Sequence, residues 1–143
     1  MTLFKQHHDY DCGPACIKML VDHFGIKHPN GSTISYRYIK RLCRCTKDGT
    51  EFRDFNNALK HFGFKRRRMS LNSYYSKKNA FVALIEDPEE PSEDHYVVLT
   101  PTSSGYLFGQ TFDIIDPYYG VNNKFPVVIR SFNSKPWVWE IYQ

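Results

Sequence analysis

The stretch QHHDYDCGPAC, residues 6–16, stands where the first regular element of this chain begins. Pro14 is tolerated in the first turn of a helix, where its missing N–H would have no partner in any case. Beyond it, apolar residues recur at helical spacing as far as Gly25, a residue type that commonly follows the last turn of a helix. The stretch therefore predicts a helix that begins directly after Cys12, holds Pro14 in its first turn and carries its apolar residues over 16–25.

Two further helices are expected in the first half of the chain. Residues 35–43 carry three apolar side chains at helical spacing, and Thr50 can cap a third helix that ends at Gly63. The apolar stripe of that third helix is interpreted as core, and it contains Phe52, Phe55, Leu59 and Phe62.

After Gly63 the pattern changes to short β-rich runs separated by turn-forming residues. Strands are predicted at 64–71, 80–85, 95–100, 106–108, 112–115, 127–132 and 137–141. Helices first and antiparallel strands second indicate an α+β fold, with an N-terminal helical half packed on a C-terminal antiparallel β-sheet. We expect one domain over residues 1–143.

Composition narrows the class of protein. The chain has 143 residues, of which 41% are hydrophobic and 16% aromatic, and this excludes a disordered chain and a coiled coil. Its longest apolar runs are far shorter than the roughly 18 residues that span a bilayer. The first ten residues contain no apolar segment of the secretory type. We therefore expect a cytoplasmic domain that does not itself span a membrane.

Charged residues and cysteines exclude several functions. The net charge is only +4, and the one dense basic run, Lys65–Arg68, is interpreted as a solvated strand or turn, so no nucleic-acid partner is expected. Six of the fifteen acidic residues lie within 86–94. The four cysteines lack zinc-ligand spacing and a secretion signal, which indicates free thiols in a reducing compartment and neither a metal nor a cofactor.

Cys12 is the candidate nucleophile. A thiol at a helix N-terminus lies at the positive end of the helix dipole, which favours the reactive thiolate. Gln6 can place a side-chain N–H beside the backbone N–H of Cys12 and so form an oxyanion hole. Gly13 has no side chain and is expected to leave room for a substrate backbone. Cys16 is interpreted as a small buried hydrophobe.

A nucleophilic cysteine needs a base and a group that orients the base. His95 begins the clearest predicted strand, and Asp116 ends another, immediately before Pro117. If the two strands are antiparallel neighbours, their ends meet over the helix terminus that carries Cys12. Asp116 would then orient His95, although it is also typical of a turn before proline.

These motifs resemble those of the bacteriocin-processing, or double-glycine-leader, cysteine peptidases. The similarity covers nearly the whole chain, in four segments in the family's order: QHHDYDCGPAC at 6–16, DGT at 48–50 leading into the helix that ends with FGF at 62–64, HYVVL at 95–99 and DPYYG at 116–120. The resemblance implies a papain-like fold and cytosolic cleavage after a Gly-Gly pair that ends the leader of a secreted peptide. Cys12 would be the nucleophile, His95 the base, Asp116 the orienting group and Gln6 the oxyanion donor.

The resemblance also implies partners. These are a precursor peptide that carries the leader and an ABC transporter, fused or separate, at the cytosolic face of the membrane. An amphipathic leader helix would lie on an apolar patch, for which Tyr36, Tyr38, Tyr74 and Tyr75 are candidates. The acidic segment 86–94 is longer than the family pattern predicts, and it would narrow the cleft or select basic residues near the scissile bond.

Two other functions stay open. A non-catalytic module of the same fold would bind a leader without cleaving it. An acyltransferase of the transglutaminase type would pass the same thioester intermediate to an amine instead of water.

Overall fold

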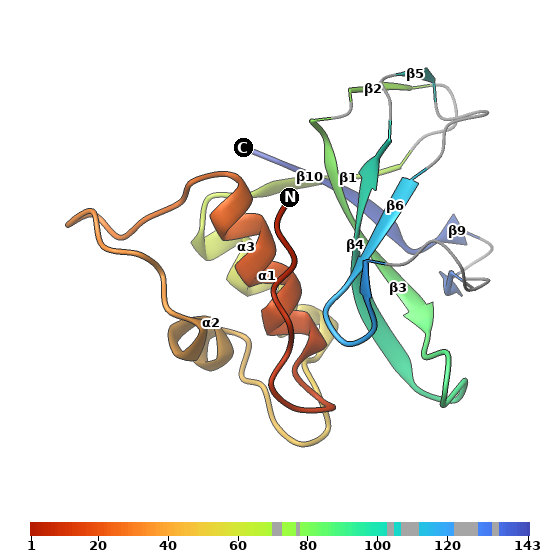
Figure 1. Cartoon of the computed structure of the whole chain (residues 1–143), viewed down its shortest axis with the longest axis horizontal. Coiled ribbons are helices and arrows are strands. Elements are labelled where there is room, and N and C mark those ends of the chain that lie inside the picture. The colour runs from red at the N-terminus through yellow and green to blue at the C-terminus, as the bar shows by residue number, and fades with distance from the viewer. Residues whose placement is uncertain (70–72, 77, 103–104, 107–111, 122–128, 133–134) are drawn as a thin grey trace.

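Figure 1 shows a computed structural model of the chain, which describes residues 1–69, 73–76, 78–102, 105–106, 112–121, 129–132 and 135–143. Within these residues the helices come first: α1 (Cys12–His23), α2 (Tyr36–Leu42) and α3 (Phe52–His61). The strands follow: β1 (Lys65–Arg68), β2 (Tyr74–Tyr75), β3 (Ala80–Glu86), β4 (Asp94–Pro101), β5 (Gly105–Tyr106), β6 (Phe112–Asp116), β7 (Gly120–Val121), β8 (Ser131–Phe132), β9 (Lys135–Pro136) and β10 (Val138–Tyr142).

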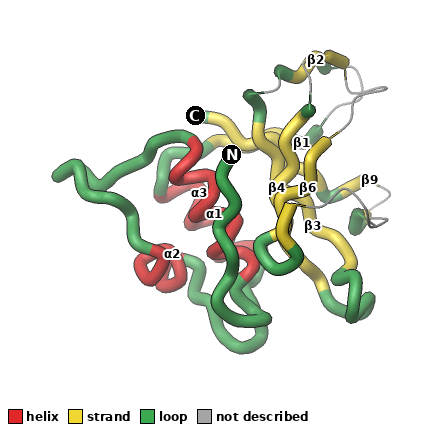
Figure 2. Tube along the Cα trace, in the orientation of Figure 1, coloured by secondary structure: helices red, strands yellow, loops and turns green. Residues whose placement is uncertain are grey.

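Six of the strands form one antiparallel sheet in the order β1-β10-β3-β4-β6-β7. The three helices lie together on one side of this sheet, and α1 packs against β4 (Figures 1 and 2). Among the short strands, β2 pairs with β5 and β8 pairs with β9. The predicted α+β fold, a helical half packed on an antiparallel sheet, is confirmed.

The main core fills the space between the helices and the sheet. Side chains of α1 pack there against side chains of β3 and β4, and these include Ile17, Leu20, Val21, Val82, Leu84 and Val98. Alternate residues of the same strands, such as Phe81 and Val97, pack on the opposite face of the sheet. Both faces of β3 are therefore covered, which explains why its sequence is apolar almost without interruption.

Two helices end as the glycines predict. Gly25 follows α1 with a φ of +67°, and the N–H of Ile26 donates to the carbonyl of Val21 at 2.9 Å. Gly63 follows α3 in the same left-handed conformation, with a φ of +79°. This geometry satisfies carbonyl groups of the last turn that have no partner within the helix.

The predicted starts of these two helices are each wrong by one residue. Helix α1 begins at Cys12, and its N-cap residue Asp11 accepts the first helical hydrogen bond through its backbone carbonyl. Helix α3 begins after Glu51, so Thr50 is not its cap. In both helices the residue at the N-cap position makes no side-chain capping bond. Asp11 is of a type that usually caps, but its carboxylate accepts the N–H of His8, and Glu51 is not a preferred N-cap residue.

Two interpretations of individual side chains are corrected. Phe55 and Phe62 are buried as expected, but Phe52 is 40% exposed because it is the first residue of α3, at the rim of a cleft. The basic run forms strand β1, and strand alternation leaves Arg66 and Arg68 half-buried, whereas the interpretation made them solvated.

Some predictions fall outside what the structure describes. Residues 70–71, 107–108 and 127–128, which belong to the predicted strands 64–71, 106–108 and 127–132, are not among the described residues. The four cysteines are free, as predicted. No described helix has the length and apolar character needed to cross a membrane.

Candidate active site

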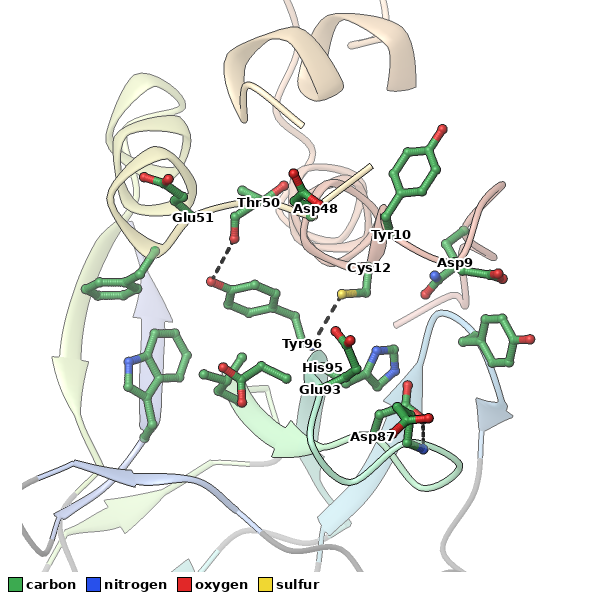
Figure 3. Close-up of a pocket in the computed structure, with 18 of the residues that line it drawn as sticks. Asp9, Tyr10, Cys12, Asp48, Thr50, Glu51, Asp87, Glu93, His95 and Tyr96 are labelled. Atoms are coloured by element: carbon green, nitrogen blue, oxygen red, sulfur yellow. Dashed lines mark hydrogen bonds between the residues drawn. The ribbon is translucent and has the colours of Figure 1, made fainter. Parts of the chain in front are cut away.

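Cys12 is the first residue of α1 and faces the sheet. Its thiol is almost buried, with 8% of the residue exposed, and the backbone N–H of Tyr96 on β4 lies 3.5 Å from its Sγ (Figure 3). The side chain therefore sits at a helix N-terminus and beside a backbone donor.

His95 and Asp116 are brought together by neighbouring strands. β4 pairs with β6 in antiparallel register, as the prediction for His95 and Asp116 requires, and His95 Nε2 lies 2.7 Å from Asp116 Oδ1. The same oxygen accepts the N–H groups of Tyr118 at 2.8 Å and Tyr119 at 3.1 Å. Asp116 thus shapes the turn after Pro117 and contacts His95 with a single carboxylate oxygen.

The His95 imidazole is held in its charged form. Burial lowers the pKa of His95, but hydrogen bonds with Asp116 and Cys12, together with the charges of these two groups, outweigh it and raise the pKa to about 10. At neutral pH the ring therefore carries two protons. Because Nε2 is engaged by Asp116, Nδ1 is the nitrogen left for the thiol of Cys12.

Gln6 lines the same cleft as Cys12. Its backbone N–H donates to the carbonyl of Pro117 at 2.9 Å, which ties the N-terminal segment to the turn after β6. One N–H of its side-chain amide donates to the carbonyl of His8 at 2.6 Å. The amide nitrogen carries a second N–H, which is the group available to an incoming oxygen.

The cleft around Cys12 has a volume of about 1130 Å³ and two chemically different ends. One end, named here the aromatic end, is formed by Phe52, Trp137, Trp139, Arg66 and Arg68. The other, named here the acidic end, is formed by the segment that precedes His95 and includes Asp87, Glu89, Glu90, Glu93 and Asp94. Thr50 and Glu51 lie to one side of Cys12, and Asp9 and Asp87 lie toward the other (Figure 3).

Comparison with known proteins agrees with this fold. A model of the peptidase C39 family matches residues 1–135. The chain belongs to the peptidase C39 family. No curated protein sequence matches it.

Solved structures resemble this C39 chain over nearly its whole length. One is the peptidase domain of Streptococcus ComA, a bi-functional ABC transporter involved in a quorum-sensing pathway, with 24% identity, a TM-score of 0.58 and coverage of 98% of this chain and 95% of that one. Another is a double glycine motif protease from an AMS/PCAT transporter in complex with the leader peptide, with 16% identity, a TM-score of 0.57 and coverage of 97% and 88%. The peptidase domain of Streptococcus mutans ComA has 20% identity, a TM-score of 0.52 and coverage of 99% and 98%.

Asp11 is a residue of the C39 site to which the sequence analysis gave no role. Its side chain is fully buried, accepts the backbone N–H of His8 at 2.9 Å and lies 3.5 Å from Nζ of Lys40. Burial raises the pKa of Asp11, but the hydrogen bonds from His8 and Tyr36 and the charge of Lys40 lower it below its usual value. The carboxylate therefore fixes the loop that ends at Cys12. An acidic residue directly before a helix was the only signal in the sequence.

Gly13 has a packing role that the sequence did not indicate. It is not among the residues that line the cleft. A Cβ at this position would lie 3.2 Å from Thr50 Cβ and 3.5 Å from Phe55 Cδ2. Its missing side chain therefore lets α1 approach the segment before α3.

The tyrosines proposed as a leader-binding patch do not form one surface. Tyr75 is buried on the far face of the sheet, with 1% exposed, whereas Tyr74 is 58% exposed. Tyr36 and Tyr38 are half-buried on α2, where their hydroxyl groups contact Asp11 and His61. The prediction is wrong for Tyr75, because strand alternation turns neighbouring residues to opposite faces.

Proposed function

We propose that this C39 chain is a cysteine endopeptidase, with Cys12 as nucleophile, His95 as general base and acid, and Asp116 as the residue that orients His95. The proposal is carried by the contact between a buried carboxylate and an imidazole beside a thiol at a helix N-terminus. Membership in a peptidase family supports it.

The reaction begins with a thiolate–imidazolium pair. Sγ of Cys12 attacks the carbonyl carbon of the scissile bond, and the carbonyl oxygen takes the negative charge. The second N–H of Gln6 and the backbone N–H of Cys12, which has no partner within the helix, would donate to that oxygen. When the intermediate collapses, the C–N bond breaks, and His95 gives its proton to the departing amine.

The second half of the reaction releases the acyl group. His95, now neutral, takes a proton from a water molecule while the water oxygen attacks the thioester carbon. The C–S bond breaks, the acyl group leaves as a carboxylic acid that gives its proton to the solvent, and Cys12 returns to the thiolate beside a protonated His95. Both steps use the same imidazole, which Asp116 keeps in one orientation.

The same chemistry gives the substrate a direction in the cleft. The departing amine must lie beside His95 to receive its proton, so the half of the substrate after the cleaved bond lies on the side of His95 and the acidic end. The half before the bond would then lie on the side of Thr50, which Figure 3 shows beside Cys12. Phe52 of the aromatic end follows Thr50 closely in the chain and lines the same cleft. The half before the cleaved bond is the leader.

A Gly-Gly pair at the end of the leader suits the space beside Cys12. The hydroxyl of Tyr96 donates to the carbonyl of Thr50 at 3.5 Å, which joins the sheet wall to the helical wall next to the thiol. Tyr96 is also stacked on Phe55, with ring centroids 4.5 Å apart, and so is held in place. A passage closed in this way excludes side chains by steric contact and admits glycine. The substrate would be a precursor peptide at the cytosolic face of the membrane, and the partner an ABC transporter.

The first experiment is intact-mass analysis of a synthetic Gly-Gly leader peptide incubated with the protein and with Cys12→Ala. We expect a single cut after the second glycine, with no product above background from Cys12→Ala or His95→Ala. Circular dichroism of both variants serves as the control for folding.

Other outcomes contradict the proposal in different ways. Binding without a cut by the wild type would indicate a docking module, and a product joined to an added amine would indicate an acyltransferase. Cleavage by Cys12→Ala at the wild-type rate would remove Cys12 from the mechanism. Alkylation gives an independent check, since iodoacetamide should label Cys12 much faster than the buried thiols of Cys16 and Cys43.

A further inference from the structure

Arg66 is held over aromatic rings at the aromatic end of the cleft. It faces the helical layer on β1, and its Cζ lies 4.1 Å from the ring centroid of Trp139 and 5.1 Å from that of Phe52. Arg68, two residues along the same strand, lies 4.7 Å from the Trp139 ring centroid. The two guanidinium groups thus flank one indole ring and both line the cleft.

These two cations have no carboxylate partner among the described residues. Arg67, which faces the other side of the sheet, forms an ion pair with Glu140, and Arg130 forms ion pairs with Glu86 and Asp94. Among the described residues, Arg68 donates a hydrogen bond to the carbonyl of Pro136, at 3.0 Å. The aromatic end therefore carries two positive charges that the described part of the chain leaves unpaired.

Two buried donors at this end also lack a partner. Within the described residues, Nη1 of Arg66 and Nε1 of Trp139 make no hydrogen bond. Burial lowers the pKa of Arg66, and the neighbouring charge of Arg68 lowers it further. Buried donors are nearly always satisfied in folded proteins, so a pair of them beside an unpaired cation indicates that an acceptor is supplied from outside the chain.

We infer that the aromatic end is a subsite for a carboxylate, the side chain of an aspartate or glutamate in the leader, upstream of the Gly-Gly pair. This inference rests on the proposed function, which places the leader at this end. A guanidinium group presents its donors in a planar fork that matches a carboxylate, and stacking on Trp139 and Phe52 holds the fork in one plane. The subsite would select acidic leaders over neutral ones.

The test measures binding rather than cleavage, so that it does not depend on catalysis. Fluorescent peptides ending in Gly-Gly and three further residues are made from neutral residues, with a single glutamate placed in turn at each position from the third to the tenth before the cleavage site. At each position, the same peptide with glutamine in place of glutamate is the reference. Dissociation constants for Cys12→Ala are measured by fluorescence anisotropy.

We expect glutamate to bind about tenfold tighter than glutamine at one position, as for a hydrogen bond to a charged group. Adding Arg66→Gln should abolish that preference and leave the affinity for the glutamine peptide within about twofold. Arg66→Glu should instead prefer lysine at the same position. Lys65→Gln is the matched control, because Lys65 precedes Arg66 on β1 and is exposed, and it should keep the preference.

Three results would overturn the inference: no position at which glutamate binds tighter, a preference that survives Arg66→Gln, or no binding of any peptide. If Arg66→Gln unfolds, Arg66→Lys keeps the charge without the fork and should retain only part of the preference. A glutamate preference together with no cleavage by the wild type would contradict the proposed function alone.

Discussion

The two walls of the cleft bring their reactive groups into place in different ways. The helical wall carries Gln6, Asp11 and Cys12 in one short segment, which is held by hydrogen bonds among neighbours in the chain and by contacts with Pro117 and Lys40. The sheet wall carries His95 and Asp116 on separate strands, aligned only by the pairing of β4 with β6. The first wall is a local structure, and the second exists only when the sheet has formed in register.

The largest expected effect tests the sheet wall. Asp116→Ala leaves His95 without its orienting acceptor, and we expect kcat/KM to fall about 10²–10⁴-fold. Asp116→Asn keeps an acceptor oxygen but removes the charge that helps to raise the pKa of His95. It should therefore lose less activity than Asp116→Ala.

The pH dependence of kcat/KM distinguishes the charge of Asp116 from its role in orienting His95. In the wild type kcat/KM should be level from pH 7 to 9 and fall as pH rises through about 10, where His95 loses the proton that the proposed mechanism passes to the leaving amine. In Asp116→Asn that fall should begin at lower pH. If kcat/KM of Asp116→Asn falls at the same pH as that of the wild type, the carboxylate of Asp116 acts on His95 through geometry alone.

A smaller effect is expected from the helical wall. Asp11→Asn removes the charge that interacts with Lys40 and His8, and should lower the free energy of unfolding at pH 7 by about 1–3 kcal/mol. Since the pKa of Asp11 is lowered in the folded state, this contribution is present above pH about 4 and is lost as pH falls through the folded pKa.

Chemical denaturation at pH 7 and pH 3 measures the Asp11 effect. The difference between wild type and Asp11→Asn should shrink at the lower pH, and Asp9→Asn, a change of the same charge at an exposed neighbour, is the control. A stability difference that is the same at both pH values would contradict the role given to the Asp11 charge.

The smallest expected effect concerns the acidic end, which the sheet wall holds through one arginine. Arg130 donates to Asp94 at 2.7 Å, to Glu86 at 3.0 Å and to the carbonyl of Pro91 at 2.7 Å, and so anchors the segment before His95. Arg130→Gln should raise KM about fivefold with little change in kcat. A fall in kcat with unchanged KM would instead show that this segment acts on His95 itself.

The difference between the walls explains how much could be predicted from sequence. The candidate groups of the helical wall lie in one local motif, and their neighbourhood follows from the start of a helix. His95 and Asp116 could be chosen because each stands at the end of an apolar run, and neighbouring strands can bring such ends together. The role of Asp11 was not predicted, because a buried ion pair with Lys40 on another helix leaves no local pattern.

The aromatic end of the cleft could not be predicted at all. It depends on β10 lying between β1 and β3, which places Trp139 beside Arg68 although they are far apart in the chain. From sequence alone, Phe52 fitted a buried helical stripe and Arg66 fitted a solvated strand. Each position is set by the non-local strand order, which residue spacing does not reveal.

That strand order has a consequence for the newly synthesised chain. Strand β10 comprises residues 138–142, and in the described structure it is the only partner of β1 and covers one edge of β3. Its buried Glu140 bonds to Asn79 at 2.5 Å and to Arg67, contacts that fix the register. While the ribosome is still adding these residues, both neighbouring strands expose unpaired backbone groups, and Cys12 faces a cleft without its Trp139 wall. A chain whose residue 142 has not yet left the ribosome therefore has neither the finished sheet edge nor the aromatic end of the cleft, so the site that we propose cannot form on it.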